Sequence, residues 1–202
     1  MSTITTPKLP VFQRPPTAVW RFTVDQYHQM ISYGILKDED PVELVSGWIV
    51  PKMPRTPAHN STVTRLQRSL WTLLRTEWVV RAQCAVILDD SEPEPDITVA
   101  VGPDGRYDDR HPGQTEIALV IEVAESSLFR DRNGKAPAYA AAQLPHYWIV
   151  NLPNRQVEVY DQPTPNAPAY GRRRDYQIDD DVPLIVFERQ VGLIAVREIL
   201  PL

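Results

Sequence analysis

The chain has 202 residues, of which 43% are hydrophobic and 23% charged, a balance that fits one folded domain with a buried core and excludes disordered and collagen-like chains. No apolar stretch reaches the roughly 18 residues of a membrane helix, and the first twenty residues lack an apolar signal-peptide core, so we expect a soluble, cytoplasmic protein. The formal net charge of −5 argues against a protein that coats nucleic acid nonspecifically. It does not exclude a nuclease, in which clustered carboxylates hold metal ions.

The basic residues are dominated by arginine, because only 4 of the 21 are lysine. Arginine suits bidentate contact with phosphate, although compositional drift explains the bias equally well. The single cysteine, Cys84, cannot form an internal disulfide, and its apolar surroundings indicate a small core residue rather than a nucleophile.

Residues 1–18 lack hydrophobic periodicity and are expected to form a flexible arm ahead of a single domain at 19–202. A first helix is predicted after the capping residue Thr23, with Gly34 at its end. Its apolar residues recur at helical spacing: Val24, Tyr27, Met30 and Ile31. Two β-rich runs follow, 42–45 and 48–50, and the intervening Ser46-Gly47 predicts a tight hairpin.

A second helix is predicted from Pro57, with leucines on one face, and it should cover a sheet. The strands of that sheet are expected at 78–81, 85–88, 97–101 and 117–123, the last apolar on both faces. A third helix at about 133–143 leads to strands at 147–150 and 156–160, and a C-terminal meander runs through Tyr176, 184–187 and 193–196. This order predicts a mixed α/β sandwich.

Common catalytic signatures are missing from the sequence. There is no glycine-rich phosphate loop before a lysine and no nucleophile elbow, and the four histidines are too scattered for a zinc helix. The carboxylates remain as the candidates for chemistry.

Glu122 is the first candidate, because it lies inside the apolar strand 119–124. A buried ionised carboxylate costs several kcal/mol unless a cation or strong donors meet it. A buried salt bridge, or a strand end where the side chain reaches water, would also explain this residue.

Asp96 and Glu43 are the other candidate acids. Asp96 opens the apolar run 97–101 after two prolines, although an ordinary strand-capping aspartate has the same pattern. Glu43 lies in the first hairpin strand, and the period of two directs its side chain to the same face as that of Val45.

Three further side chains accompany these acids: Lys135, Tyr139 and His59. Lys135 precedes Tyr139 by four residues, so both project from one face of the third helix, which can lie over the end of the strand that carries Glu122. A lysine there is otherwise usually solvated. His59 points inward from the second helix, either to bond a site carboxylate or as a satisfied core histidine.

Arginines on the second helix, Arg65, Arg68 and Arg75, are candidates for phosphate contact, as are Arg172, Arg173 and Arg174. Such charged runs are also typical of a solvated face. The aspartates at 179–181 are expected to form a solvated turn.

Taken together, these residues resemble the PD-(D/E)xK nuclease superfamily and, more narrowly, its Uma-two family of restriction endonucleases. The resemblance covers most of the chain and rests on six segments in matching order and spacing: 22–27, 42–47, His59, 95–97, 121–126 with Asp131, Lys135 and Tyr139, and 146–151. It implies a restriction-endonuclease-like mixed β-sheet core flanked by helices, with an N-terminal helix and hairpin as an extension.

The resemblance also implies roles for the candidate residues. Asp96 and Glu122 would hold a divalent cation, Glu43 would complete or support the site, and Lys135 would position the attacking water, with His59 and Tyr139 in support. The lysine of the parent motif is replaced by Ala124, whereas the Uma-two pattern takes it from the following helix. Trp48 and Gln143 depart from the pattern, which often has an acid and a glycine at these positions.

The sequence therefore predicts a nuclease that hydrolyses DNA with Mg²⁺ or Mn²⁺, since carboxylate oxygens suit these hard cations. A homodimer is expected, because two such sites could cut both strands of a duplex. One alternative is a DNA-binding or defence-associated module of the same fold with latent or no activity. Another is a glycoside hydrolase that uses Asp96 and Glu122 as acid and base, which leaves Lys135 without a role.

Overall fold

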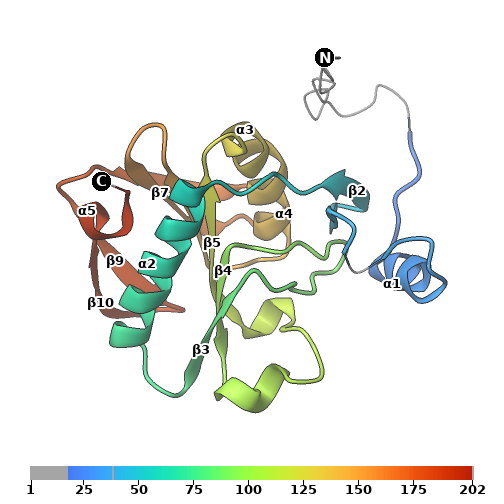
Figure 1. The fold of residues 1–202 in the computed structure, drawn as a ribbon, viewed down its shortest axis with the longest axis horizontal. Coiled ribbons are helices and arrows are strands. Elements are labelled where there is room, and N and C mark those ends of the chain that lie inside the picture. Colours follow the sequence, from blue (N-terminus) through green and yellow to red (C-terminus); the bar gives the residue numbers. More distant parts are fainter. Residues whose placement is uncertain (1–17, 38, 202) are drawn as a thin grey trace, which may run out of the picture.

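A mixed sheet of six strands, in the order β3-β4-β5-β6-β7-β8, organises the computed structural model (Figure 1). The strands are β3 (Trp78–Ala82), β4 (Ile97–Val101), β5 (Ile117–Ala124), β6 (His146–Asn151), β7 (Gln156–Pro163) and β8 (Tyr170–Tyr176). Only β5 and β6 pair in parallel within this sheet. The structure describes residues 18–37 and 39–201, so the predicted arm lies outside it except for residue 18.

The N-terminal extension consists of a helix and a hairpin, as predicted. Helix α1 (Val24–Ser32) begins with a capping box, in which Thr23 and Gln26 each accept the other's backbone N–H through a side-chain oxygen at 3.1 Å. Strands β1 (Val42–Val45) and β2 (Trp48–Pro51) form the hairpin. The turn residues Ser46 and Gly47 both have positive φ angles, 49° and 74°, as a tight primed turn requires.

One face of the sheet is covered by helix α2 (Pro57–Leu73) together with a C-terminal hairpin, β9 (Asp181–Val186) and β10 (Arg189–Ala195), and helix α5 (Val196–Ile199) (Figure 1). The apolar stripe of α2, which includes Val63, Leu66 and Leu70, packs into the larger core. Residues of alternate positions on β5, such as Ile121 and Val123, supply the sheet side of that core.

The opposite face is covered by a helical segment between β5 and β6. It consists of α3 (Leu128–Arg130), a π-helical turn η3 (Asp131–Lys135) and α4 (Ala136–Ala141). Tyr139, Leu144 and Tyr147 pack there with Val120 and Ala124 of β5. Two 3-10 turns, η1 (Asp104–Tyr107) and η2 (Gln114–Glu116), lie between β4 and β5.

The structure confirms the mixed α/β class and corrects three predicted elements: residues 85–88, the third helix and the C-terminal meander. Residues 85–88 are not a strand: Ile87 forms only an isolated bridge with Gly113, and the backbone N–H groups of Val86 and Leu88 donate to Pro93 and Ser91 within the same loop. The side chains of Val86 and Leu88 are buried, so the apolar run indicated burial rather than a sheet ladder.

The second correction concerns the third helix, which was predicted from Asn133 but already begins at Leu128, with a π-helical turn ahead of α4. It ends at Ala141, and Gln143 takes a left-handed conformation with φ of 57°. The predicted C-terminal meander is divided, because β8 joins the main sheet whereas β9 and β10 pair only with each other. Within the described ranges, none of the helices is both long and apolar enough to span a bilayer.

Candidate active site

Strand β5 places Glu122 on the face that α4 covers. Ile121 and Val123 belong to the core on the α2 side, so the alternation of the strand turns Glu122 the other way. The side chain is almost fully buried, with 4% exposure. Its Oε1 accepts hydrogen bonds from Lys135 Nζ and from the Tyr139 hydroxyl, both at 2.8 Å.

Lys135 ends the π-helical turn and connects Glu122 to the N-terminal hairpin. Its ammonium lies 3.2 Å from Glu43 Oε2 as well as 2.8 Å from Glu122 Oε1. The turn contains one residue more than an α-helical turn, a distortion that is frequent at functional sites. The contact with Glu122 is a hydrogen bond and the one with Glu43 an ion pair, so the ammonium, which has three N–H donors, keeps a donor for a further acceptor.

Glu43 reaches the site because the hairpin is bound to the segment ahead of β4. Leu44 exchanges backbone hydrogen bonds with Glu92, at 3.4 and 2.8 Å. Glu43 is 2% exposed, and its Oε2 also accepts from the backbone N–H of Glu94 at 3.0 Å. The carboxylate is therefore held by both the chain and the lysine.

Asp96 stands next to Glu122, immediately ahead of the neighbouring strand β4. Strands β4 and β5 pair Ile97 with Ile121, so the residue before β4 lies beside Glu122. Asp96 Oδ2 accepts from the Val123 N–H at 2.8 Å and contacts His59 Nε2 at 3.0 Å. His59 comes from the first turn of α2, where its N–H donates to the capping Thr56 hydroxyl at 3.2 Å.

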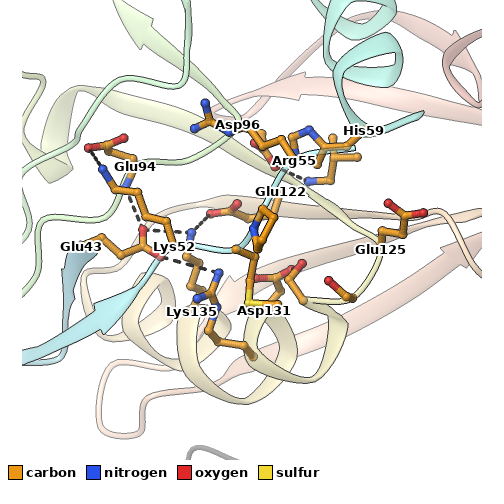
Figure 2. Close-up of a pocket in the computed structure, with 16 residues that line it drawn as sticks. Glu43, Lys52, Arg55, His59, Glu94, Asp96, Glu122, Glu125, Asp131 and Lys135 are labelled. Atoms are coloured by element: carbon orange, nitrogen blue, oxygen red, sulfur yellow. Dashed lines mark hydrogen bonds and ion pairs between the residues drawn. The ribbon is translucent and has the colours of Figure 1, made fainter. Parts of the chain in front are cut away.

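These side chains line one pocket, and Figure 2 shows them converging from the sheet and from the helix beneath it. The pocket has a volume of about 50 Å³, several times the ~10–15 Å³ that one water molecule needs. Its lining includes the four predicted residues and His59, and it also includes Lys52, Arg55, Glu94, Glu125, Arg130 and Asp131.

The electrostatics of the pocket follow from four buried carboxylates around one buried ammonium. Burial raises the pKa of the Glu122 carboxyl to about 8, although the charge of Lys135 opposes this rise. The other three acids, Asp96, Asp131 and Glu43, add to it. Burial disfavours the charged form of Lys135, but Glu122 and Glu43 outweigh burial and raise the pKa of the ammonium, so Lys135 stays charged.

His59 and Asp131 are perturbed by the same surroundings. Burial lowers the pKa of the His59 imidazole, but the hydrogen bond to Asp96, the charge of Asp96 and the contact with Asn60 together outweigh burial, so the net shift is upward. Burial raises the pKa of Asp131, against the charge of Lys135 and the Ser127 hydroxyl that donates to Asp131 Oδ2 at 2.5 Å. The acidic side chains that line the pocket thus outnumber its lysines and arginines.

The carboxylates of Asp96 and Glu122 fit a hard divalent cation that takes only two ligands from the protein. Asp96 Oδ1 and Glu122 Oε2 accept no hydrogen bond from the described residues, and both acids line the pocket. Mg²⁺ typically takes one or two protein carboxylates and keeps waters and phosphate oxygens as its other ligands. In the described part of the chain, no group of three acidic, histidine or cysteine side chains is placed to hold an ion.

The predicted arginines lie elsewhere. None of Arg65, Arg68 and Arg75 lines the pocket. Arg65 donates to the Leu200 carbonyl, and Arg68 is exposed on α2. Arg75, predicted on the second helix, is exposed but lies beyond the end of α2, which ends at Leu73. Arg172 and Arg173 of β8 bind Asp161 and Asp175. Asp131 was predicted only through the resemblance, and its spacing of four from Lys135 was the available signal for this acid. Arg55 and Arg130 were not predicted.

Comparison with solved structures defines the class of the fold. A crystal structure from Anabaena variabilis ATCC 29413, described as "a putative nuclease belonging to DUF820", matches with a TM-score of 0.61 and 15% sequence identity. The match covers 88% of this chain and 97% of that one, so the two share a nuclease-like fold. No curated protein matches the chain.

The family follows from the sequence itself. A model of the Uma2 family, described as "putative restriction endonuclease", matches residues 24–192. The chain belongs to this family, which is the Uma-two family that the motifs predicted.

Proposed function

We propose that the protein is a metal-dependent endonuclease that hydrolyses phosphodiester bonds of DNA at the pocket of Glu43, Asp96, Glu122 and Lys135. The observation that supports this most strongly is the position of Lys135 Nζ, 2.8 Å from Glu122 and 3.2 Å from Glu43, in a pocket that Asp96 also lines. Family membership supports the same reaction class.

Asp96 and Glu122 would hold Mg²⁺ or Mn²⁺ through their free oxygens. Held there, such an ion would supply positive charge next to the phosphate oxygens and lower the pKa of a water molecule. A free N–H of Lys135 would donate to the attacking water and orient its oxygen toward phosphorus. As the new bond from water oxygen to phosphorus forms, the water gives up a proton to solvent, the bond from phosphorus to the leaving sugar oxygen breaks, and that oxygen takes up a proton from solvent. The reaction is hydrolysis without a covalent enzyme intermediate.

The remaining residues position these groups. Glu43 holds the ammonium of Lys135 in place, and Tyr139 fixes Oε1 of Glu122, which leaves the second oxygen for the cation. His59 holds Oδ2 of Asp96 in the same manner. In this proposal Glu43 supports the site rather than ligating the ion.

The test is relaxation of supercoiled plasmid with Mg²⁺, with Mn²⁺ and with a chelator, alongside Mn²⁺ binding followed by electron paramagnetic resonance. Wild type should cut only with a divalent ion. Asp96→Asn and Glu122→Gln should lose both cutting and Mn²⁺ binding, and Lys135→Met should lose cutting alone. The matched control, Asp179→Asn, changes an exposed acid and should keep both properties.

Two results would contradict the proposal. Equal cutting by wild type and the pocket variants would identify a contaminating nuclease. Binding of Mn²⁺ and DNA without turnover would instead support a latent module of the same fold.

We also propose a homodimer, and a solution molar mass that corresponds to one chain would refute it.

A further inference from the structure

The arginines of the described chain differ in how their charge is compensated. Most of those with a side-chain contact bind a carboxylate directly: Arg106, Arg110, Arg132, Arg172, Arg173 and Arg197. Arg55 and Arg130 line the acid pocket instead, and neither makes a hydrogen bond to a carboxylate of the described residues. Their positive charge is therefore available to an anion at the mouth of the pocket.

Arg55 lies at the end of the pocket formed by Asp96 and His59. It is exposed on the segment ahead of α2, and its Nη1 donates to the amide oxygen of Gln83 at 2.9 Å. The backbone N–H of Gln83 in turn donates to the Asp96 carbonyl at 3.1 Å. A neutral partner orients the guanidinium without cancelling its charge.

Arg130 lies at the other end, beside Glu43 and Lys135. Its Nη1 donates to the Pro51 carbonyl, and its Nη2 stands 3.9 Å from Glu43 Oε1, too far for a hydrogen bond. The side chain keeps 19% exposure, and its buried Nε has no hydrogen-bond partner among the described residues. This arginine is thus held in place, but some of its N–H donors make no hydrogen bond to the described residues.

Other charged groups of the wall contribute less positive charge. Lys52 is paired with Glu94 at 2.5 Å. Glu125 is an exposed wall carboxylate that accepts from the Thr56 hydroxyl at 2.6 Å, and it disfavours an anion on its own side. Among the described residues, the two arginines are thus cations of the wall that make no hydrogen bond to a carboxylate.

We propose that Arg55 and Arg130 bind phosphates of the substrate strand on either side of the acid pocket, so that the strand crosses the pocket between them. Guanidinium groups match phosphate oxygens in bidentate geometry. The proposal rests on the proposed function, because it takes the pocket as the place of cleavage. In this proposal these two arginines take the place of Arg65, Arg68 and Arg75 as the phosphate contacts.

Salt dependence of DNA binding tests this assignment. The probe is a short fluorescein-labelled DNA duplex, and its anisotropy is followed across a KCl series with Ca²⁺ in place of Mg²⁺, with a gel to check that the duplex stays intact. Each lost phosphate contact should reduce the magnitude of the slope of log K against log salt by about 1. We expect this reduction for Arg55→Gln and for Arg130→Gln.

Two kinds of control make the result specific. Arg68→Gln and Arg75→Gln remove exposed arginines on α2 and just beyond its end, and should leave the slope unchanged. Arg55→Lys and Arg130→Lys keep the charge and should retain most of the slope, which separates lost charge from lost structure. Circular dichroism confirms that each variant is folded.

The outcomes distinguish this proposal from the proposed function. Reduced slopes for the pocket variants, in a wild type that never cuts plasmid, would support the phosphate contacts and remove the nuclease proposal. Unchanged slopes for the pocket variants, together with a wild type that cuts plasmid, would support the nuclease proposal and remove the phosphate contacts. The assignment would also be overturned if wild type does not bind the duplex, or if only Arg68→Gln and Arg75→Gln reduce the slope.

Discussion

Replacement of Glu122 by glutamine should abolish a loss of stability that the metal-free protein undergoes as the pH rises. The folded-state pKa of this carboxyl is about 8, above the ordinary value of 4.5. The folded protein therefore binds the proton more tightly than the unfolded chain does, and stability is lost as the pH rises between these two values. At about 1.4 kcal/mol per pKa unit, the loss amounts to about 3 kcal/mol between pH 4.5 and pH 7.

Glutamine keeps the shape of Glu122 and an oxygen for Lys135 and Tyr139, but it does not titrate. We expect urea denaturation in a chelator to show that Glu122→Gln gains about 3 kcal/mol relative to wild type between pH 4.5 and pH 7. Addition of Mg²⁺ should then stabilise wild type, by about 2.7 kcal/mol at a hundredfold excess over Kd, and leave the variant unchanged.

The reasoning would be refuted by parallel pH curves for the two proteins in the chelator. That result would mean that Glu122 ionises with an ordinary pKa, so that burial and the surrounding acids do not act on it.

Three further substitutions test other parts of the structure. Tyr139→Phe removes the hydroxyl that holds Glu122 Oε1 and should cost about 1–3 kcal/mol in urea denaturation; a loss below 0.5 kcal/mol would contradict this contact. Gln143→Gly should stabilise the protein by up to about 1 kcal/mol, because glycine tolerates the φ of 57° after α4, and destabilisation would show that the side-chain hydrogen bonds of Gln143 matter more. Glu116→Gln should cost about 1 kcal/mol at pH 7, after allowance for solvent screening. Arg110 lowers the pKa of Glu116 to about 2, so the cost should fade as the pH drops from 4.5 toward 2, and a cost that persists at pH 2 would contradict it.

The sequence predicted the elements whose signals are local. The cap at Thr23, the Ser46-Gly47 turn and the leucine stripe of α2 each specify their geometry within a few residues, and the structure confirms all three. Residues 85–88 misled the prediction, because an apolar run shows burial but not which backbone groups its N–H donors meet. A π-helical turn has no sequence pattern, so the start of the third helix was also missed.

For the site, periodicity supplied much of the arrangement. The alternation of β5 and the spacing of Lys135 and Tyr139 indicated that both could face Glu122, and the structure brings them to one oxygen. The arginines could not be ranked in this way. Which arginine faces the pocket depends on long-range packing of the hairpin and α3, and neither leaves a local pattern in the chain.

The central claim is that Asp96 and Glu122 together bind a divalent cation beside Lys135. An anomalous difference map from crystals soaked in Mn²⁺ tests it most directly. We expect one peak within coordination distance of both carboxylates, with the Lys135 ammonium lining the same space. A map without a peak there, from crystals in which Mn²⁺ occupies other sites, would contradict the claim.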